Sequence, residues 1–137
     1  MKLNTIYITR VDLEKIRDLI WEAQNKGYRG SAYIQALKDE LDRAEIVNPQ
    51  DVPPDVITMN TKAVLLDTET GELMEFTLVF PADADVAQGK ISILAPIGTG
   101  MLGYRVGDVF EWNTPGGKRK LRVDKILEQP EASGNYD

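Results

Sequence analysis

Carboxylates are the side chains through which this sequence could bind a metal ion, because its 137 residues include no histidine and no cysteine. Thiolate and imidazole are the usual ligands of zinc, and imidazole is the most frequent general base. Ordinary zinc sites and histidine-dependent nucleophilic catalysis are therefore excluded. Any bound metal would be a hard cation held by carboxylate oxygens. We predict no catalytic residue, no metal site and no cofactor.

A second chemically distinctive segment is 25–31, Asn-Lys-Gly-Tyr-Arg-Gly-Ser, which contains two cations and one aromatic side chain but no carboxylate. Lys26 and Arg29 have the wrong sign to coordinate a metal, but they can contact acidic groups on a partner. Tyr28 is a further candidate contact. The ordinary alternatives are that both cations are solvated and that Tyr28 packs on its own helices.

Residues 1–48 predict an antiparallel helical hairpin, a short coiled coil with segment 25–31 at its tip. Thr9 has the position of an N-cap, with Asp12 three residues later in capping-box spacing, and Ser31 is the second N-cap candidate. Each helix is expected to have about 16 residues and a length of roughly 25 Å. Apolar residues follow helical spacing in both segments: Leu13, Ile16, Leu19, Ile20 and Ala23, then Ile34, Leu37, Leu41 and Ala44.

The hydrophobic period changes after residues 48–55, where three prolines predict a stiff connector. We place the domain boundary there, between 1–48 and 49–137. Alternating apolar residues then predict a mostly antiparallel sheet, which makes the fold class α+β. The strand candidates include 62–66, 73–80, 109–112 and 120–127.

The segment 89–108 contains the greatest density of structural signals. Its first residues favour a strand, Pro96 suits the first turn of a helix, and Gly103 suits the end of that helix. Gly107-Asp108 is a typical turn before the next strand. This single short helix is the one candidate cover for the sheet within residues 49–137, with Ile97 and Leu102 in the core. Its many glycines indicate that another segment or another protein packs closely against it.

Charge is distributed unevenly along the chain. Residues 1–48 have eight basic and eight acidic side chains, whereas residues 49–137 have eight basic and fourteen acidic ones, so the net charge of −6 comes from the second part. An acidic domain repels phosphates, so we expect no autonomous DNA or RNA binding. No apolar run approaches the length of a membrane span, and no signal-peptide pattern is present. We expect a cytoplasmic monomer with a protein partner.

The motifs in the second domain resemble those of the bacterial GreA/GreB transcript cleavage factors. The pattern Gly-x-Ile-Ser, Ser/Ala-Pro-Leu/Ile, Leu-Leu-Gly, Gly-Asp and Pro-x-Gly is matched here at Gly89–Ser92, Ala95–Ile97, Met101–Gly103, Gly107–Asp108 and Pro115–Gly117. The short hairpin, the entry segment 56–60 and the tail 129–132 are more similar to the Rnk branch of this superfamily, the regulators of nucleoside diphosphate kinase.

This resemblance implies an FKBP-like C-terminal domain and one partner, RNA polymerase. In the Gre factors the C-terminal domain docks on a coiled coil of the largest polymerase subunit, at the entrance of the secondary channel. The positions of this sequence that correspond to that contact are Ala95, Pro96, Ile97 and Gly98. Ala95 stands where the family pattern often has serine, so one hydroxyl group is lost from this contact.

The resemblance also implies a difference in chemistry. The tip of the long Gre hairpin has paired acidic residues that help to hold a second Mg²⁺ in the polymerase active centre. Segment 25–31 lacks such residues, and the nearest acids, Glu22 and Asp39, belong to the helices. We therefore predict a non-enzymatic regulator that occupies the channel entrance and competes with Gre factors without stimulating cleavage.

Three other functions stay open at this stage. One is transcript cleavage and elongation of the GreA/GreB type. A second is peptidyl-prolyl isomerisation, which the FKBP-like fold allows but which needs an aromatic-walled pocket for proline, and aromatic residues are few here. A third is regulation of a protein other than polymerase. The family name refers to nucleoside diphosphate kinase levels, and altered transcription could change these indirectly.

Overall fold

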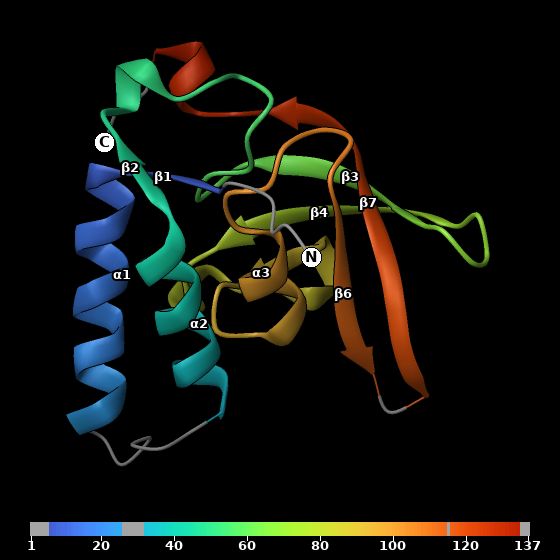
Figure 1. The fold of residues 1–137 in the computed structure, drawn as a ribbon, viewed down its shortest axis with the longest axis horizontal. Helices are drawn as coiled ribbons and strands as arrows, with labels where there is room; N and C mark the ends of the chain where they lie inside the picture. Colours follow the sequence, from blue (N-terminus) through green and yellow to red (C-terminus); the bar gives the residue numbers. More distant parts are fainter. Residues whose placement is uncertain (1–5, 26–31, 115, 135–137) are drawn as a thin grey trace.

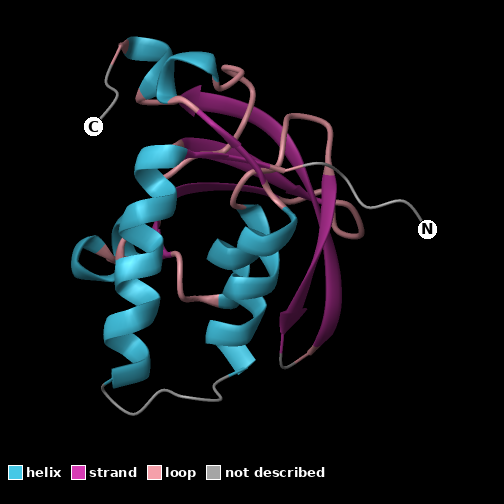
Figure 2. Ribbon diagram, turned by 60° about the vertical axis from the view of Figure 1, so that its left-hand side comes forward, coloured by secondary structure: helices cyan, strands magenta, loops and turns pink. Residues whose placement is uncertain are grey.

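The N-terminal part of the chain is a helical hairpin that is closed at its base by a small sheet (Figure 1). The computed structural model describes residues 6–25, 32–114 and 116–134. Helices α1 (Arg10–Ala23) and α2 (Ala32–Arg43) lie side by side (Figures 1 and 2). Strand β1 (Tyr7–Thr9) precedes α1 and pairs in parallel with β2 (Glu45–Val47), which follows α2. This pairing ties together the two ends of the hairpin.

The start of α1 and the apolar stripes agree with the sequence pattern. The backbone N–H of Asp12 donates to Thr9 Oγ1 at 3.1 Å, which confirms the N-cap. The helices have 14 and 12 residues, hence lengths of about 21 and 18 Å, so the expected 16 residues and 25 Å were overestimates. The second predicted N-cap, Ser31, lies outside the described residues. The buried members of the stripes are Leu13, Ile16, Ile20, Ala23, Ile34, Leu37 and Leu41.

Five strands form the main sheet, in the order β5-β4-β3-β7-β6. They are β3 (Lys62–Asp67), β4 (Leu73–Val79), β5 (Lys90–Ser92), β6 (Val109–Thr114) and β7 (Gly117–Glu128). Every pairing is antiparallel except β4 with β5, which is parallel. The α+β class and the mostly antiparallel sheet are confirmed, with β5 as the exception. That exception arises because the chain after β4 turns back through two short 3-10 turns, η3 (Pro81–Asp83) and η4 (Val86–Gln88). Lys90 then enters opposite Thr77, and β5 runs in the same direction as β4.

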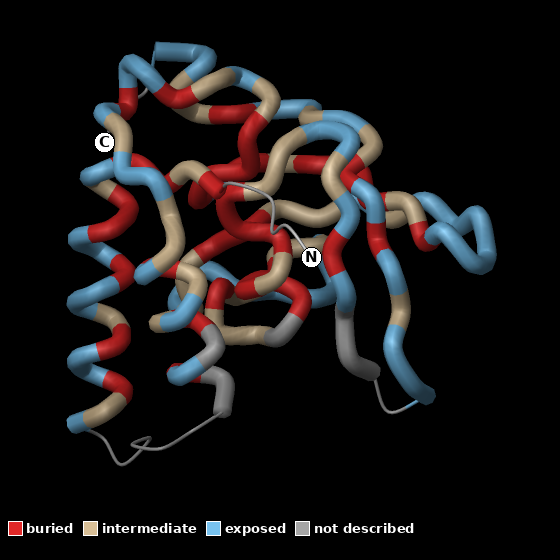
Figure 3. The backbone as a smooth tube through the Cα atoms, viewed as in Figure 1, coloured by how far each residue is buried: buried red, intermediate tan, exposed pale blue. Residues whose placement is uncertain are grey.

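One continuous hydrophobic core joins the sheet, the helix α3 (Pro96–Met101) and the hairpin (Figure 3). Ile97 is 5% exposed and Leu102 is fully buried, as the pattern indicates. The cover of the sheet is larger than the sequence suggested, because buried residues of β1, α1 and α2 belong to the same cluster. Fully buried members from successive elements are Ile6, Ile16, Leu37, Ile57, Leu78, Met101 and Leu121.

Gly103, in the turn after α3, lies directly against the N-terminal segment. Its φ is +81°, and a Cβ at this position would lie 2.7 Å from Ile6 Cβ and 3.1 Å from the carbonyl oxygen of Tyr7. The N–H of Tyr7 donates to the Gly103 carbonyl at 3.2 Å, and the N–H of Gly103 donates to the Ile57 carbonyl at 2.8 Å. The glycine therefore allows three chain segments to meet backbone to backbone.

Alanine substitutions at Gly103 and at a second glycine separate the stability cost of close packing from that of backbone strain. Gly71 has a similar φ of +76°, but nothing lies within 4 Å of the position of its Cβ, so it is a matched control. We expect Gly71→Ala to cost about 1 kcal/mol of unfolding free energy from the left-handed backbone alone. Gly103→Ala should cost roughly 3 kcal/mol, since overpacking adds to the strain. Urea denaturation of both variants measures the difference, and equal losses would contradict the close approach.

Candidate functional site

The loop between β5 and α3 is shaped by short-range hydrogen bonds. Ser92 accepts the N–H of Leu94 on its hydroxyl at 3.0 Å and the N–H of Ala95 on its carbonyl at 3.0 Å. Thr99, on α3, donates its hydroxyl to the carbonyl of Ile93 at 2.7 Å. Ala95 is the N-cap of α3 and has no side chain that could accept a hydrogen bond there. The loop thus presents Ala95 at the start of the helix.

The four residues predicted to contact a partner have different surroundings. Ala95 is half-buried, whereas Ile97 and Gly98 are buried. A Cβ at Gly98 would lie 2.1 Å from the carbonyl oxygen of Ser92, so this glycine lets α3 pack directly on the end of β5. The side chain of Pro96 lies outside the part of the structure that is described. In this conformation Ile97 and Gly98 hold α3 in place, which leaves Ala95 and Pro96 as the candidates for direct contact.

The three hairpin-tip candidates, Lys26, Tyr28 and Arg29, lie outside the described residues. Glu22, near the described end of α1, is exposed. Asp39, on α2, is exposed and accepts a hydrogen bond from Gln35 Nε2 at 2.9 Å. No group of three or more Asp and Glu side chains that could hold a metal occurs in the ranges 6–25, 32–114 and 116–134.

A buried carboxylate connects the hairpin to the segment that precedes β3. Asp12, 4% exposed, accepts the backbone N–H of Met59 at 3.1 Å. The segment that carries Met59 is held from the other side as well, because the hydroxyl of Thr58 donates to Glu131 Oε1 at 2.7 Å. Burial raises the pKa of Asp12 to about 6, while the hydrogen bond from Met59 acts to lower it.

The last turn of α2 makes a second polar contact, with the loop that follows α3. Arg43 Nη2 donates to the hydroxyl of Tyr104 at 2.8 Å, and the same nitrogen lies 3.0 Å from Glu40 Oε2. The Arg43 guanidinium also lies 5.7 Å from the centre of the Tyr104 ring. Burial raises the pKa of both Glu40 and Tyr104. Together with Asp12, these contacts define how the hairpin is oriented on the sheet.

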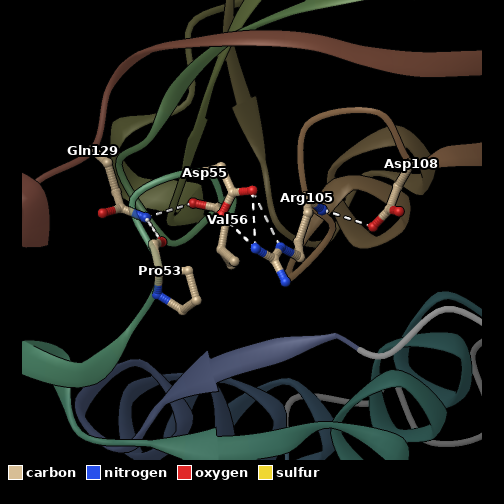
Figure 4. Close-up of polar contacts among 6 residues, drawn as sticks. All are labelled: Pro53, Asp55, Val56, Arg105, Asp108 and Gln129. Atoms are coloured by element: carbon tan, nitrogen blue, oxygen red, sulfur yellow. Dashed lines mark hydrogen bonds and ion pairs between the residues drawn. The ribbon is translucent and has the colours of Figure 1, made fainter.

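The turn after α3 is organised by two aspartates (Figure 4). Asp108 accepts the backbone N–H of Arg105 at 2.9 Å, so the Gly-Asp motif closes the turn as its sequence indicates. The guanidinium of Arg105 forms a forked pair with Asp55 in the proline-rich connector, with Nε and Nη2 both 3.1–3.2 Å from the carboxylate oxygens. The connector is therefore anchored to the sheet.

Sequence reasoning missed most of these contacts. The partners of Asp12, Arg43 and Arg105 lie 47, 61 and 50 residues away along the chain, and no local pattern pairs them. One signal was present. Asp12 was recognised at its capping position, and it lies among the apolar residues that mark the inner face of α1.

The comparisons with known proteins agree with this architecture. The family model described as "Transcription elongation factor, GreA/GreB, C-term" matches residues 44–128, and the model "Rnk N-terminus" matches residues 4–47. The chain belongs to the GreA/GreB transcription elongation factor family. It is of the Rnk type, since its N-terminal segment matches that model and its similarity to a Rnk regulator extends over nearly its full length.

That relative is the "Regulator of nucleoside diphosphate kinase" of Escherichia coli K12, which is 39% identical over 99% of this chain and 98% of its own length. GreA of Desulfotalea psychrophila is 40% identical over 69% of this chain and 59% of its own length. A GreA/GreB structure from Nitrosomonas europaea has a TM-score of 0.74 with 35% identity, covering 92% of this chain and all of the other. These relatives are regulators of transcription or of an enzyme.

No helix in the described part of the chain is long and apolar enough to cross a bilayer. The family membership and the relatives support a transcription-factor-like role.

Because the carboxyl group of Asp12 is buried, we expect the unfolding free energy to depend on pH. The pKa of Asp12 rises from 3.8 to about 6 on folding, so its stabilising contribution is complete below pH 3.8 and is lost as the pH rises through 6. Asp12→Asn keeps an oxygen acceptor for Met59 and removes the titration. Between pH 4 and 7 we expect the variant to gain about 2 kcal/mol of unfolding free energy relative to the wild type.

Urea denaturation at several pH values measures this difference. Asp18→Asn, at an exposed position on the same helix, is the matched control for the loss of a carboxylate. If the unfolding free energies of Asp12→Asn and the wild type change with pH in parallel, Asp12 makes no pH-dependent contribution to stability.

Proposed function

We propose that this protein is a transcription regulator that binds RNA polymerase at the entrance of the secondary channel, on the coiled coil of the largest subunit. There it competes with Gre factors without stimulating transcript cleavage. It acts as a cytoplasmic monomer. The observation that carries the proposal is a retained docking-type segment, 89–108, in the same chain as a hairpin tip that lacks carboxylates.

The docking half of the proposal is supported by the family membership and by the packing of α3. The GreA/GreB C-terminal model spans the whole main sheet and α3. Gly98 lies against Ser92 of β5, Thr99 donates to Ile93, and Ile97 is buried. These contacts support a fixed position for the start of α3. A rigid surface binds a partner at a lower entropy cost than a mobile one.

The non-cleaving half is supported by the hairpin. Segment 25–31 supplies cations where a second Mg²⁺ would need carboxylates. The helices of about 21 and 18 Å also give a short reach. We include in the proposal the finer fold assignments: a hairpin domain at 1–48 that is a short coiled coil, and an FKBP-like domain at 49–137.

A transcript cleavage assay on backtracked elongation complexes tests the non-cleaving role. We expect no cleavage above the intrinsic rate when this protein is added alone. In the presence of GreA, we expect stimulated cleavage to fall as the concentration of this protein increases. Cleavage that this protein stimulates, and that Glu22→Gln or Asp39→Asn abolishes, would instead assign it as a cleavage factor.

A substitution at the start of α3 tests the docking surface. Pro96→Arg should weaken binding to purified polymerase at least ten-fold, since it places a large cation in the centre of the proposed contact. Pro81→Arg is the matched control, because Pro81 also begins a short helix and lies outside segment 89–108. Circular dichroism checks the folding of both variants.

Equal binding by Pro96→Arg and the wild type would rule out this surface. A pull-down in which polymerase subunits are absent would favour a partner other than polymerase.

A further inference from the structure

The main sheet has an outer face that is turned away from the hydrophobic core. Along β3, Ala63 and Leu65 belong to the core cluster, whereas their neighbours Val64 and Leu66 do not. Successive side chains of a strand point to opposite sides, so Val64 and Leu66 lie on the outer face. Helices α1, α2 and α3 lie on the core side (Figure 2), and no helix of the described residues covers the outer face.

A row of side chains crosses this outer face over four strands. Leu66 lies opposite Leu73 of β4 on one side and opposite Arg122 of β7 on the other. Arg122 in turn lies opposite Val109 of β6. Leu73 is 60% exposed and Val109 is 42% exposed. Because side chains that lie opposite each other on one face are within contact distance, the row presents exposed apolar groups on both sides of one guanidinium.

Strand β7 adds positive charge to an otherwise acidic domain. Five of the eight basic residues in 49–137 lie in its segment 118–125, which contains a single acid, Asp124. Two of these cations, Lys120 and Lys125, are exposed and form no ion pair with any described residue. Their charges are therefore available to a partner.

The apolar row lies between these two lysines. Lys120 precedes Arg122 by two residues in β7, so both side chains point to the outer face. On the other side of the row, Lys125 lies opposite Val64. The acids of the same face are engaged by other lysines. Glu111 Oε2 lies 3.8 Å from Lys118 Nζ, and Glu75 Oε1 lies 2.9 Å from Lys62 Nζ.

A surface with apolar groups between unpaired cations is complementary to a partner that has apolar groups between carboxylates. We propose that the outer face of the main sheet binds an acidic protein segment in which apolar residues alternate with Asp or Glu. Its carboxylates pair with Lys120 and Lys125, and its apolar side chains pack on Leu66 and Leu73.

A nucleic acid is a poorer fit to the same face. Its phosphates repeat at every nucleotide, so some of them would approach the carboxylates of Glu75 and Glu111 and the apolar row. An alternating protein segment can instead place apolar side chains at those positions. Segment 89–108 supplies α3, which lies on the core side of the sheet, so this proposal and the polymerase-docking proposal are independent.

Fluorescence anisotropy of a rhodamine-labelled peptide, Glu-Leu-Glu-Val-Glu-Leu-Glu-amide, titrated with the full chain tests the surface. We expect saturable binding that weakens as the salt concentration rises. The same peptide with glutamine in place of each glutamate should bind about ten-fold more weakly, since two exposed ion pairs are lost. A labelled heptauridine is the nucleic-acid arm. The absence of saturable peptide binding would overturn the proposal, as would tighter binding of the heptauridine than of the acidic peptide.

Two pairs of variants locate the binding on the outer face. Lys120→Glu should weaken peptide binding about five-fold. Arg17→Glu, at an exposed position on α1, changes the net charge by the same amount and should bind as the wild type does. Leu73→Ser should weaken binding about three-fold, whereas Val86→Ser, at a position 80% exposed in η4, should not. Circular dichroism checks that all four variants fold. Equal losses in the test and control variants, or unchanged binding in Lys120→Glu, would contradict the proposed surface.

Discussion

The structure depends on how segment 56–61 is held between the hairpin and the sheet. Asp12 accepts the N–H of Met59 from the hairpin side, and Gln129 and Glu131 bind the same segment from the C-terminal side. Because Asp12 is almost fully buried, removing its partner would leave an unsatisfied carboxyl in the core. The hairpin and the sheet are thereby packed as a single body with one continuous core.

Three glycines of segment 89–108 each allow a different part of the chain to pack closely. Gly98 lets α3 lie on the end of β5, Gly100 leaves room for the ring of Phe110, and Gly103 admits strand β1. Most of the close packing that these residues indicated is therefore internal to the chain. What is left for a partner is the start of α3, which the internal contacts hold rigid.

The proposed function follows from this division of roles. A regulator that blocks a channel entrance needs a rigid docking surface and a hairpin in a defined orientation, but it needs no catalytic group. The contacts of Asp12 and Arg43 define that orientation, and the tip sequence supplies cations in place of metal ligands.

The sequence by itself determined the elements and the family. The apolar period, the cap at Thr9, the prolines and the glycines predicted the hairpin, most of the sheet and α3, since these signals act over a few residues. The division at residue 48 and the tip contacts stay predictions. The tertiary structure alone decided the β1–β2 pair, the parallel β5 and the contacts of Asp12, Arg43 and Gln129. Their partners lie far apart along the chain, and only folding brings them together.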